Sequence, residues 1–180
     1  MYRMKTRVLI FLFMLCSLSL DAQIRLEGYR QTDINPELLT GRWKAHWISM
    51  PGEPANVYGV YHMRKTFELD EVPSRFIVHV TADNRYKLYL NGRFVSLGPA
   101  RGDIYNWSFE TVDLAPYLRK GKNTLASVVW NYAERKPVAQ ISYDQTGFIL
   151  QGNTGHEAVV NTDTTWVCLL YTSPSPRDTR

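Results

Sequence analysis

The 180-residue sequence has only two cysteines, Cys16 and Cys168, and each lies near an end of the chain. Residues 23–167 contain none, so this part of the protein cannot form a disulfide framework, a thiolate metal site or a cysteine nucleophile. Helical patterns are also scarce, because no segment longer than about ten residues repeats apolar side chains at helical spacing. These absences favour a domain of short strands stabilised by an apolar core.

The chain also lacks an apolar run of the roughly 20 residues needed to cross a bilayer. Its longest run, Val8–Leu20, has 13 residues, follows three basic residues and is followed by Ala22, a small residue suited to cleavage. This pattern predicts a signal peptide over residues 1–22 and a secreted or periplasmic protein. A retained membrane helix and a lipid anchor on Cys16 are the alternatives, although Leu15 is larger than the residue expected before a lipidated cysteine.

A strong excess of charge of one sign is missing as well. The whole sequence has 21 basic and 17 acidic residues. Three of the basic residues and one acidic residue lie in the predicted leader, and two basic residues and one acidic residue lie in residues 168–180. Residues 23–167 therefore carry 16 basic and 15 acidic side chains. This balance predicts no nucleic-acid partner and no anionic membrane partner. A segment of about 145 residues is long enough for one domain with a core, and too short for two.

The last residues have an unusual composition. All eleven residues from 168 to 178 match the translation of a transposon-type sequencing adapter. We therefore expect residues 168–180 to be a non-native tail and the natural protein to be interrupted after Val167, which makes the chain a truncated fragment. The alternative is a natural flexible tail rich in serine and proline.

The clearest local pattern predicts a β-hairpin. Side chains alternate from Tyr86 to Leu90, Asn91-Gly92 follows, and residues 93–97 can return antiparallel. Asparagine and glycine both tolerate the positive φ angles of a type I′ turn. Residues 98–102 are rich in glycine and proline, so an irregular loop is expected there.

Other short strands are expected around this hairpin. Residues 23–42 are predicted to be a linker with at most one helical turn, and residues 43–167 to be the folded domain. Asp113 is expected to cap a single turn that follows it. The expected strands are residues 43–49 at a sheet edge, 57–69, a half-buried 75–80, 107–114, 124–130 after a turn at 121–123, 138–143 and 147–150. The predicted fold class is all-β, a two-sheet antiparallel β-sandwich.

Four segments in order resemble the N-terminal β-sandwich module of bacterial α-L-rhamnosidases. They are residues 83–92 (DNRYKLYLNG), 98–101 (GPAR), 110–118 (ETVDLAPYL), and 121–123 (GKN) ahead of Val129-Trp130. The resemblance runs from about Trp43 to Trp166. It implies a galactose-binding-like jelly roll. It also implies that catalysis belongs to a separate helical barrel downstream, the expected partner of this domain within the intact glycoside hydrolase.

No catalytic residue is predicted in this chain. A glycosidase needs two carboxyl groups about 5 to 10 Å apart across the bond that breaks. Glu110 and Asp113 are close in sequence, but positions three apart on a strand face opposite sides of the sheet. The four histidines show no short ligand spacing such as H-x-x-x-H, so no zinc site is predicted.

One hypothesis assigns carbohydrate binding to Asp83, Asn84 and Trp107. Sandwich modules similar to this one bind terminal sugars through a loop Asp and Asn, sometimes beside a calcium ion, which prefers hard oxygen ligands. Trp107 would add an aromatic face for a sugar ring. The structural alternative is an Asx-type turn at Asp83-Asn84 with Arg85 or Arg101 pairing nearby, and Trp107 in the core.

Three functions follow from these observations. The favoured one is a noncatalytic module of a secreted α-L-rhamnosidase acting on rhamnose-containing glycans, with an apolar patch that the rest of the enzyme covers. The second is an autonomous carbohydrate-binding module with a cleft lined by polar loop residues and an aromatic side chain. The third is the N-terminal sandwich of another glycosidase, such as a β-galactosidase, because the hairpin motif is shared.

Overall fold

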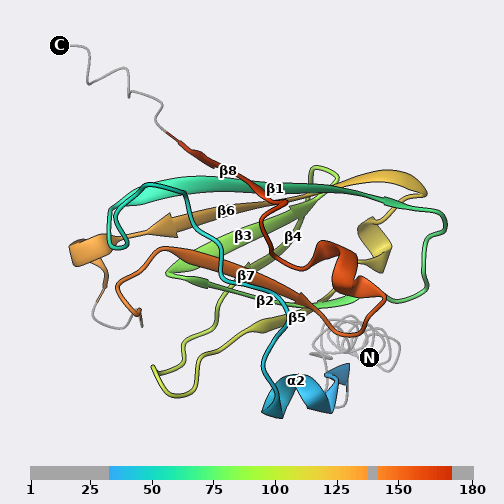
Figure 1. Cartoon of the computed structure of the whole chain (residues 1–180), viewed down its shortest axis with the longest axis horizontal. Coiled ribbons are helices and arrows are strands. Elements are labelled where there is room, and N and C mark those ends of the chain that lie inside the picture. Colours follow the sequence, from blue (N-terminus) through green and yellow to red (C-terminus); the bar gives the residue numbers. More distant parts are fainter. Residues whose placement is uncertain (1–32, 138–141, 172–180) are drawn as a thin grey trace, which may run out of the picture. The chain divides into compact units, whose positions relative to one another are not determined.

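The computed structural model describes residues 33–137 and 142–171, and strands dominate this part of the chain (Figure 1). One antiparallel sheet has five strands in the order β4-β3-β6-β1-β8, and the other has three in the order β5-β2-β7. The strands are β1 (Gly59–Leu69), β2 (Ile77–Asp83), β3 (Arg85–Leu90), β4 (Arg93–Gly98), β5 (Glu110–Asp113), β6 (Gly121–Asn131), β7 (Gly147–Gly152) and β8 (Val167–Leu170). The short helices are α2 (Pro36–Thr40), η2 (Ala115–Tyr117), η3 (Ala133–Arg135) and η4 (Glu157–Val160).

This architecture confirms the predicted all-β, two-sheet antiparallel β-sandwich. The compact unit that holds both sheets begins at Ile34. Within the described residues, no helix has both the length and the apolar character needed to cross a membrane.

The hairpin at Asn91-Gly92 forms as predicted. β3 and β4 pair antiparallel, and φ is 51° at Asn91 and 79° at Gly92. Asn91 also connects the turn to its surroundings, because its Nδ2 donates to the carbonyl of Tyr117 (2.9 Å) and its Oδ1 accepts from the N–H of Thr124 (3.0 Å). The hairpin is thereby fixed against the first residues of β6, its neighbour in the larger sheet.

The core lies between the two sheets. Phe148 of β7 meets Tyr86 of β3 with ring centroids 6.0 Å apart, and both rings are fully buried. Burial raises the pKa of the Tyr86 hydroxyl, which bonds Ser96 at 3.1 Å. The inward-facing residues of the smaller sheet include Val78, Val80, Ala82, Phe148 and Leu150.

β2 departs from its predicted half-buried character. The strand runs to Asp83, and all seven of its residues are buried. The face turned away from the core carries His79, Thr81 and Asp83, and aromatic residues from other segments cover it. Trp43 lies over this face, with its ring centroid 6.2 Å from that of His79. Alternation along the sequence predicts which residues share a face, but it cannot show that a distant segment covers the polar face.

Residues 43–49 do not form the predicted edge strand, and they make only a single β-bridge, to β7. The N–H of Ala45 donates to the side chain of Gln151 (2.8 Å), and that of His46 to the carbonyl of Thr162 (2.9 Å). Because a side chain and a loop satisfy these donors, the segment lies along β7 without extending its ladder.

The predicted strands 57–69, 107–114, 124–130 and 147–150 are confirmed with shifted bounds. β1 and β6 cover most of the predicted strands 57–69 and 124–130, and β7 covers 147–150. β5 is shorter than the predicted strand 107–114. The ladder of β6 begins at Gly121, inside the predicted turn.

Some predictions fall outside the described residues. The signal peptide (1–22), the first half of the linker (residues 23–32) and residues 138–141 of a predicted strand lie there. Ser142 and Tyr143, the last two residues of that predicted strand, lie in a loop. Of the predicted tail, residues 168–170 complete β8, which pairs antiparallel with β1. The non-native origin of residues 168–180 stays a prediction.

Candidate functional site

An open cleft of about 850 Å³ lies on the outer face of the three-stranded sheet. Its volume falls within the roughly 300 to 1,000 Å³ typical of ligand sites. We call it the aromatic cleft because its lining includes Trp43, Trp47, Trp107, Phe109 and Tyr143. Its polar lining residues are Arg42, His46, Thr81, Asp83, Gln145 and Thr146.

Three of the aromatic side chains contact one another at the rim. Trp107 and Tyr143 are stacked, with ring centroids 5.1 Å apart and an interplanar angle of 22°. Trp47 meets Trp107 edge to face at 6.3 Å. Trp47 and Tyr143 are 51% and 56% exposed, so both present apolar ring surface to solvent. Gly147 makes room for this arrangement, because a Cβ there would lie 2.8 Å from the Trp47 ring.

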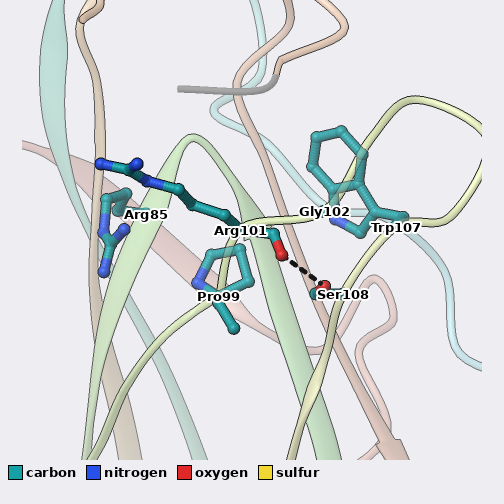
Figure 2. A pocket seen from close by; sticks show the side chains of 7 residues that line it. Arg85, Pro99, Arg101, Gly102, Trp107 and Ser108 are labelled. Carbon is teal, nitrogen blue, oxygen red and sulfur yellow. Dashed lines mark hydrogen bonds between the residues drawn. The ribbon is translucent and has the colours of Figure 1, made fainter. Parts of the chain in front are cut away.

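Trp107 is half-buried and is fixed by the floor of the cleft. Its indole N–H donates to the hydroxyl of Thr81 (2.9 Å), which in turn donates to the carbonyl of Ser108 (2.8 Å). The Ser108 hydroxyl donates to the carbonyl of Arg101 (3.2 Å), closing the loop that carries Trp107 (Figure 2). The ring therefore has a defined orientation at the cleft and does not lie in the core between the sheets.

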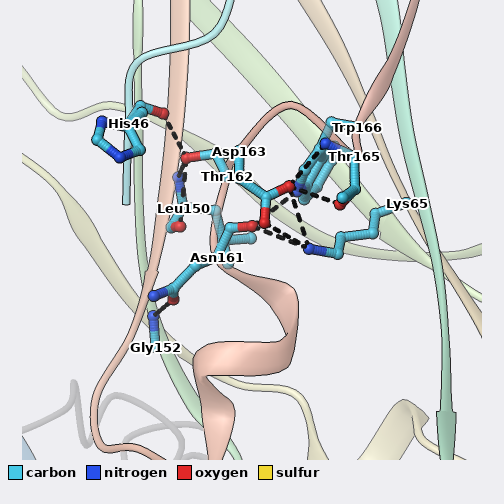
Figure 3. Close-up of polar contacts among 9 residues, drawn as sticks. All are labelled: His46, Lys65, Leu150, Gly152, Asn161, Thr162, Asp163, Thr165 and Trp166. Carbon is cyan, nitrogen blue, oxygen red and sulfur yellow. Dashed lines mark hydrogen bonds and ion pairs between the residues drawn. The ribbon is translucent and has the colours of Figure 1, made fainter. Parts of the chain in front are cut away.

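A polar clamp at residues 161–166 fixes the segment that carries His46, another residue of the cleft lining (Figure 3). The hydroxyl of Thr162 donates to the carbonyl of His46 (2.6 Å) and accepts from the N–H of Leu150 (3.2 Å). Lys65 of β1 forms an ion pair with Asp163 of the clamp, with Nζ and Oδ2 3.4 Å apart. The clamp thus connects both sheets to the segment that carries Trp47.

Beside the cleft, the buried His79 bonds through both ring nitrogens. Nδ1 lies 3.0 Å from the hydroxyl of Thr111, and Nε2 lies 3.0 Å from Oδ1 of Asn153. The same Asn153 oxygen accepts from the N–H of Asn35 (2.7 Å), the residue that caps α2. Burial lowers the pKa of His79, and Asn153 and the charge of Glu157 oppose that shift only in part.

The lowered pKa of His79 predicts loss of stability in mild acid. The unfolded chain binds a proton at the ordinary histidine pKa of about 6.5, whereas the folded chain binds it only at lower pH. The free energy of unfolding should therefore be highest above that pH and should fall as the pH drops from about 6.5 toward 5. Urea denaturation across this window measures the slope.

The His79 ring itself provides the check on this expectation. Its NMR chemical shifts should remain those of a neutral imidazole as the pH falls through the ordinary histidine pKa of about 6.5, and should change only at lower pH. A His79 ring that gains its proton at or above the ordinary histidine pKa would contradict the buried, neutral state.

Of the three predicted carbohydrate-binding residues, Asp83 and Trp107 line the cleft and Asn84 does not. Asp83 is a strand residue, so the predicted Asx-type turn is absent there. Its carboxylate accepts from the hydroxyl of Ser142 (2.6 Å) and the N–H of Tyr143 (2.7 Å). Asn84 is fully buried: its Nδ2 donates to Asp83 Oδ1 (2.6 Å), and its Oδ1 accepts from the N–H of Tyr132 (2.8 Å).

This arrangement does not fit a calcium ion at Asp83. Calcium takes six to eight oxygen ligands, and a hydrogen-bond donor facing the ion cannot serve as one. The side-chain amide of Asn84, the hydroxyl of Ser142 and the N–H of Tyr143 all donate to the carboxylate. Within residues 33–137 and 142–171, no three acidic, histidine or cysteine side chains gather as a metal site would require.

Glu110 and Asp113 have separate structural contacts. Glu110 accepts from the N–H of Ala100 at 2.7 Å. Asp113 accepts from the N–H of Phe76 and from that of Ala115, both at 2.9 Å. The Ala115 bond gives the capping contact expected from the sequence, at the start of η2.

Sequence reasoning missed most of the aromatic cleft. Trp47 lies in a segment predicted to be an edge strand, and Phe109 and Tyr143 lie in predicted strands to which the sequence assigns no role in a site. The sequence offers one signal for the cleft: aromatic residues are frequent in segments whose apolar and polar side chains do not alternate with the period of a strand. That signal does not show that three separate segments converge on one sheet face.

The structure defines a β-sandwich module with an aromatic cleft, and solved structures share this fold. A GH78 family rhamnosidase of Bacillus sp. GL1 matches with 27% identity and a TM-score of 0.60, covering 72% of this chain and 14% of that enzyme. An α-L-rhamnosidase from Dictyoglumus thermophilum shares the fold at 22% identity and a TM-score of 0.58, covering 75% of this chain and 17% of that one. No family model and no curated protein matches the chain.

These matches confirm the resemblance to α-L-rhamnosidases suggested by the sequence motifs. The chain spans only a small part of each enzyme, as expected for a fragment that resembles an N-terminal module.

Proposed function

We propose that the chain is the noncatalytic N-terminal module of a secreted α-L-rhamnosidase. The match at 27% identity over 72% of the chain, covering only 14% of the enzyme, is the observation that carries this proposal. Secretion through residues 1–22 and a catalytic barrel downstream are parts of the proposal.

The contacts of the acidic residues support a noncatalytic role. Glu110 and Asp113, the pair closest to a glycosidase arrangement in sequence, accept hydrogen bonds from backbone N–H groups. Neither of them lines the aromatic cleft.

Exposed apolar side chains supply a surface that a further domain could cover. Phe94 and Leu97 of β4 are exposed, and Phe94 pairs with Tyr89 of β3 at 5.8 Å between ring centroids. Exposed apolar surface of this kind marks contact with another domain or protein. We assign that role to the catalytic barrel of the same polypeptide.

Extending the natural gene beyond Val167 tests the proposal. The extended protein should encode a helical barrel and hydrolyse nitrophenyl α-L-rhamnoside, and it should appear outside the cytoplasm with its N-terminus at Gln23. An extended protein that hydrolyses a β-galactoside, and leaves the rhamnoside intact, would instead make this the sandwich of a different glycosidase.

The aromatic cleft favours carbohydrate binding as a second function. Asp83, Asn84 and Trp107 were the predicted binding residues, and Trp107 stacks on Tyr143 at the rim while Asp83 lies at the floor. Sugar rings present C–H groups that pack on aromatic faces, and their hydroxyls require polar partners. We assign direct contact to Trp107, Tyr143 and Asp83, and an indirect role to Asn84, which positions Asp83.

Calorimetric titration with L-rhamnose, with and without calcium, tests this second function. Binding at millimolar sugar is expected, and because the site does not fit the ion, calcium should not change it. The Tyr143→Ala variant should weaken binding several-fold, because it removes an exposed ring assigned to the sugar. Phe94→Ala is the matched control, since it also removes an exposed aromatic ring but lies on the other sheet. An absence of heat at millimolar sugar would rule out this use of the cleft.

A further inference from the structure

A groove of about 240 Å³ lies on the outer face of the five-stranded sheet. Tyr61 of β1 and Val129 of β6 are fully buried in the core. Because successive side chains of a strand point to opposite faces, the residues on either side of these two point outward. We call this groove the Trp130 groove, and its lining includes Tyr58, Val60, Lys87, Val128, Trp130 and Tyr132.

The lining of the Trp130 groove suits a protein surface better than a sugar. Among the described residues that line it, Lys87 is the one charged side chain, and there is no side-chain carboxylate or amide. The hydroxyls of a sugar need several such partners, whereas apolar and aromatic side chains gathered on a surface mark contact with protein. Tyr58 is 68% exposed, so its ring is available for such a contact.

The apolar surface continues from the groove to both edges of the sheet. Residues paired across neighbouring strands share one face. One such row crosses β8, β1, β6, β3 and β4 in turn, and it consists of Leu169, His62, Val128, Lys87 and Leu97. The two ends of the row are exposed apolar side chains, Leu169 at 65% and Leu97 at 47%. The groove is therefore the centre of a wide face that no described segment covers.

β8 leads the polypeptide out of the sheet beside this groove. Val167, the last residue before the predicted non-native tail, pairs with Arg64 of β1, and β8 runs antiparallel to β1 from there (Figure 1). The N–H of Tyr171 donates to the carbonyl of Val60 (2.8 Å), which lines the groove. The Tyr171 ring lies 5.6 Å from that of His62 between centroids. A polypeptide that continues from β8 thus starts at the edge of the groove.

We propose that the outer face of the five-stranded sheet, centred on the Trp130 groove, is the docking surface for the domain that continues the polypeptide from β8. This inference rests on the proposed function, which makes that domain the catalytic barrel, and it adds the surface that the domain covers. A domain tethered a few residues from the groove has a high effective concentration there. Its contact surface should be apolar, with an acidic side chain opposite Lys87, because an unpaired buried ammonium is costly.

Thiol labelling of Lys87→Cys with a maleimide measures whether this face is covered. In the 180-residue chain, Lys87→Cys should react as fast as Lys44→Cys, the matched control on the exposed segment along the other sheet. In the protein extended past Val167 with its natural sequence, Lys87→Cys should react about tenfold more slowly, because a packed interface excludes the reagent. The rate at Lys44→Cys should be the same in both proteins. Peptide mass analysis assigns the label to the introduced cysteine.

Two exposed tyrosines locate the contact. In the extended protein, Tyr58→Ala removes a ring of the groove and should raise the labelling rate of Lys87→Cys several-fold. Tyr105→Ala is the matched control, because Tyr105 is 89% exposed and lines neither the groove nor the aromatic cleft. It should leave the labelling rate unchanged. Thermal melts establish that the variants are folded.

The outcomes separate docking from the proposed function. Equal labelling of Lys87→Cys in the two proteins would overturn the docking proposal, even where the extended protein hydrolyses nitrophenyl α-L-rhamnoside and so supports the proposed function. Slow labelling in a dimeric 180-residue chain would also overturn it, because a second copy would then cover the face. Protection of Lys87→Cys in an extended protein that hydrolyses no rhamnoside would support docking and contradict the proposed function.

Discussion

Replacing Phe148 with alanine is expected to lower the free energy of unfolding by about 3 to 5 kcal/mol. The Phe148 ring is fully buried and contacts Tyr86 at 6.0 Å and Trp166 at 5.6 Å between ring centroids. Tyr86 belongs to the five-stranded sheet and Phe148 to the three-stranded sheet, so the substitution opens a cavity between the two layers. The loss of buried apolar surface and the unfilled cavity both contribute to the expected destabilisation.

Urea denaturation followed by tryptophan fluorescence measures this loss. Phe94→Ala is the control, because Phe94 is 53% exposed on β4 and its removal should change stability by no more than about 0.5 kcal/mol. Similar small effects from both substitutions would show that the two sheets do not share the core described above.

Asn84→Ala is expected to cost about 3 kcal/mol, because a buried polar network would lose its central member. The side chain of Asn84 donates to Asp83 (2.6 Å) and to Ser142 (3.1 Å), and it accepts from the N–H of Tyr132 (2.8 Å). Alanine would leave a nearly buried carboxylate with one donor fewer and a backbone N–H with no side-chain acceptor. Both groups were desolvated on folding, so the lost partners are not fully replaced by water.

The exposed Asn106 provides the matched control for Asn84. Asn106→Ala removes a similar amide on the loop at residues 103–106 and should cost well under 1 kcal/mol, because water can replace its bonds. If Asn84 were instead a direct sugar ligand with little structural role, its variant would keep the unfolding midpoint and lose only L-rhamnose binding.

The hairpin and the inward-facing residues could be predicted because their determinants are local. Asn91-Gly92 supplies the two positive φ angles of the turn, and the alternation around it assigns Tyr86, Leu88 and Leu90 to the core. Period-2 alternation also places Val78 and Val80 inward. These inferences need only a few neighbouring residues, and the structure confirms them.

The outer face of β2 could not be predicted because its environment is tertiary. His79 and Thr81 are the polar side chains that a half-exposed strand would show to water. They are covered because residues 43–47 lie along β7 and because the loop at residues 101–109 returns over β2. The donors of Ala45 and His46 find partners about a hundred residues away in sequence, which no local pattern reveals.

The candidate site was predicted only in part for the same reason. Similarity to sugar-binding sandwich modules points to Asp83 and Asn84, and the aromatic ring of Trp107 completes the hypothesis; Asp83 and Trp107 line the cleft. Asp83 is the last residue of β2 and lines the cleft, whereas Asn84 directly after it is fully buried and supports Asp83 from behind through a hydrogen bond. Trp47 and Tyr143 come from segments that had no predicted connection with Trp107.

The central claim is that this sandwich supports catalysis located elsewhere and performs none itself. The most direct test is to incubate the purified 180-residue chain with nitrophenyl α-L-rhamnoside, beside the extended protein at the same molar concentration. The account predicts that only the extended protein releases nitrophenol. Steady release by the 180-residue chain, retained after further purification and lost on its denaturation, would contradict the account.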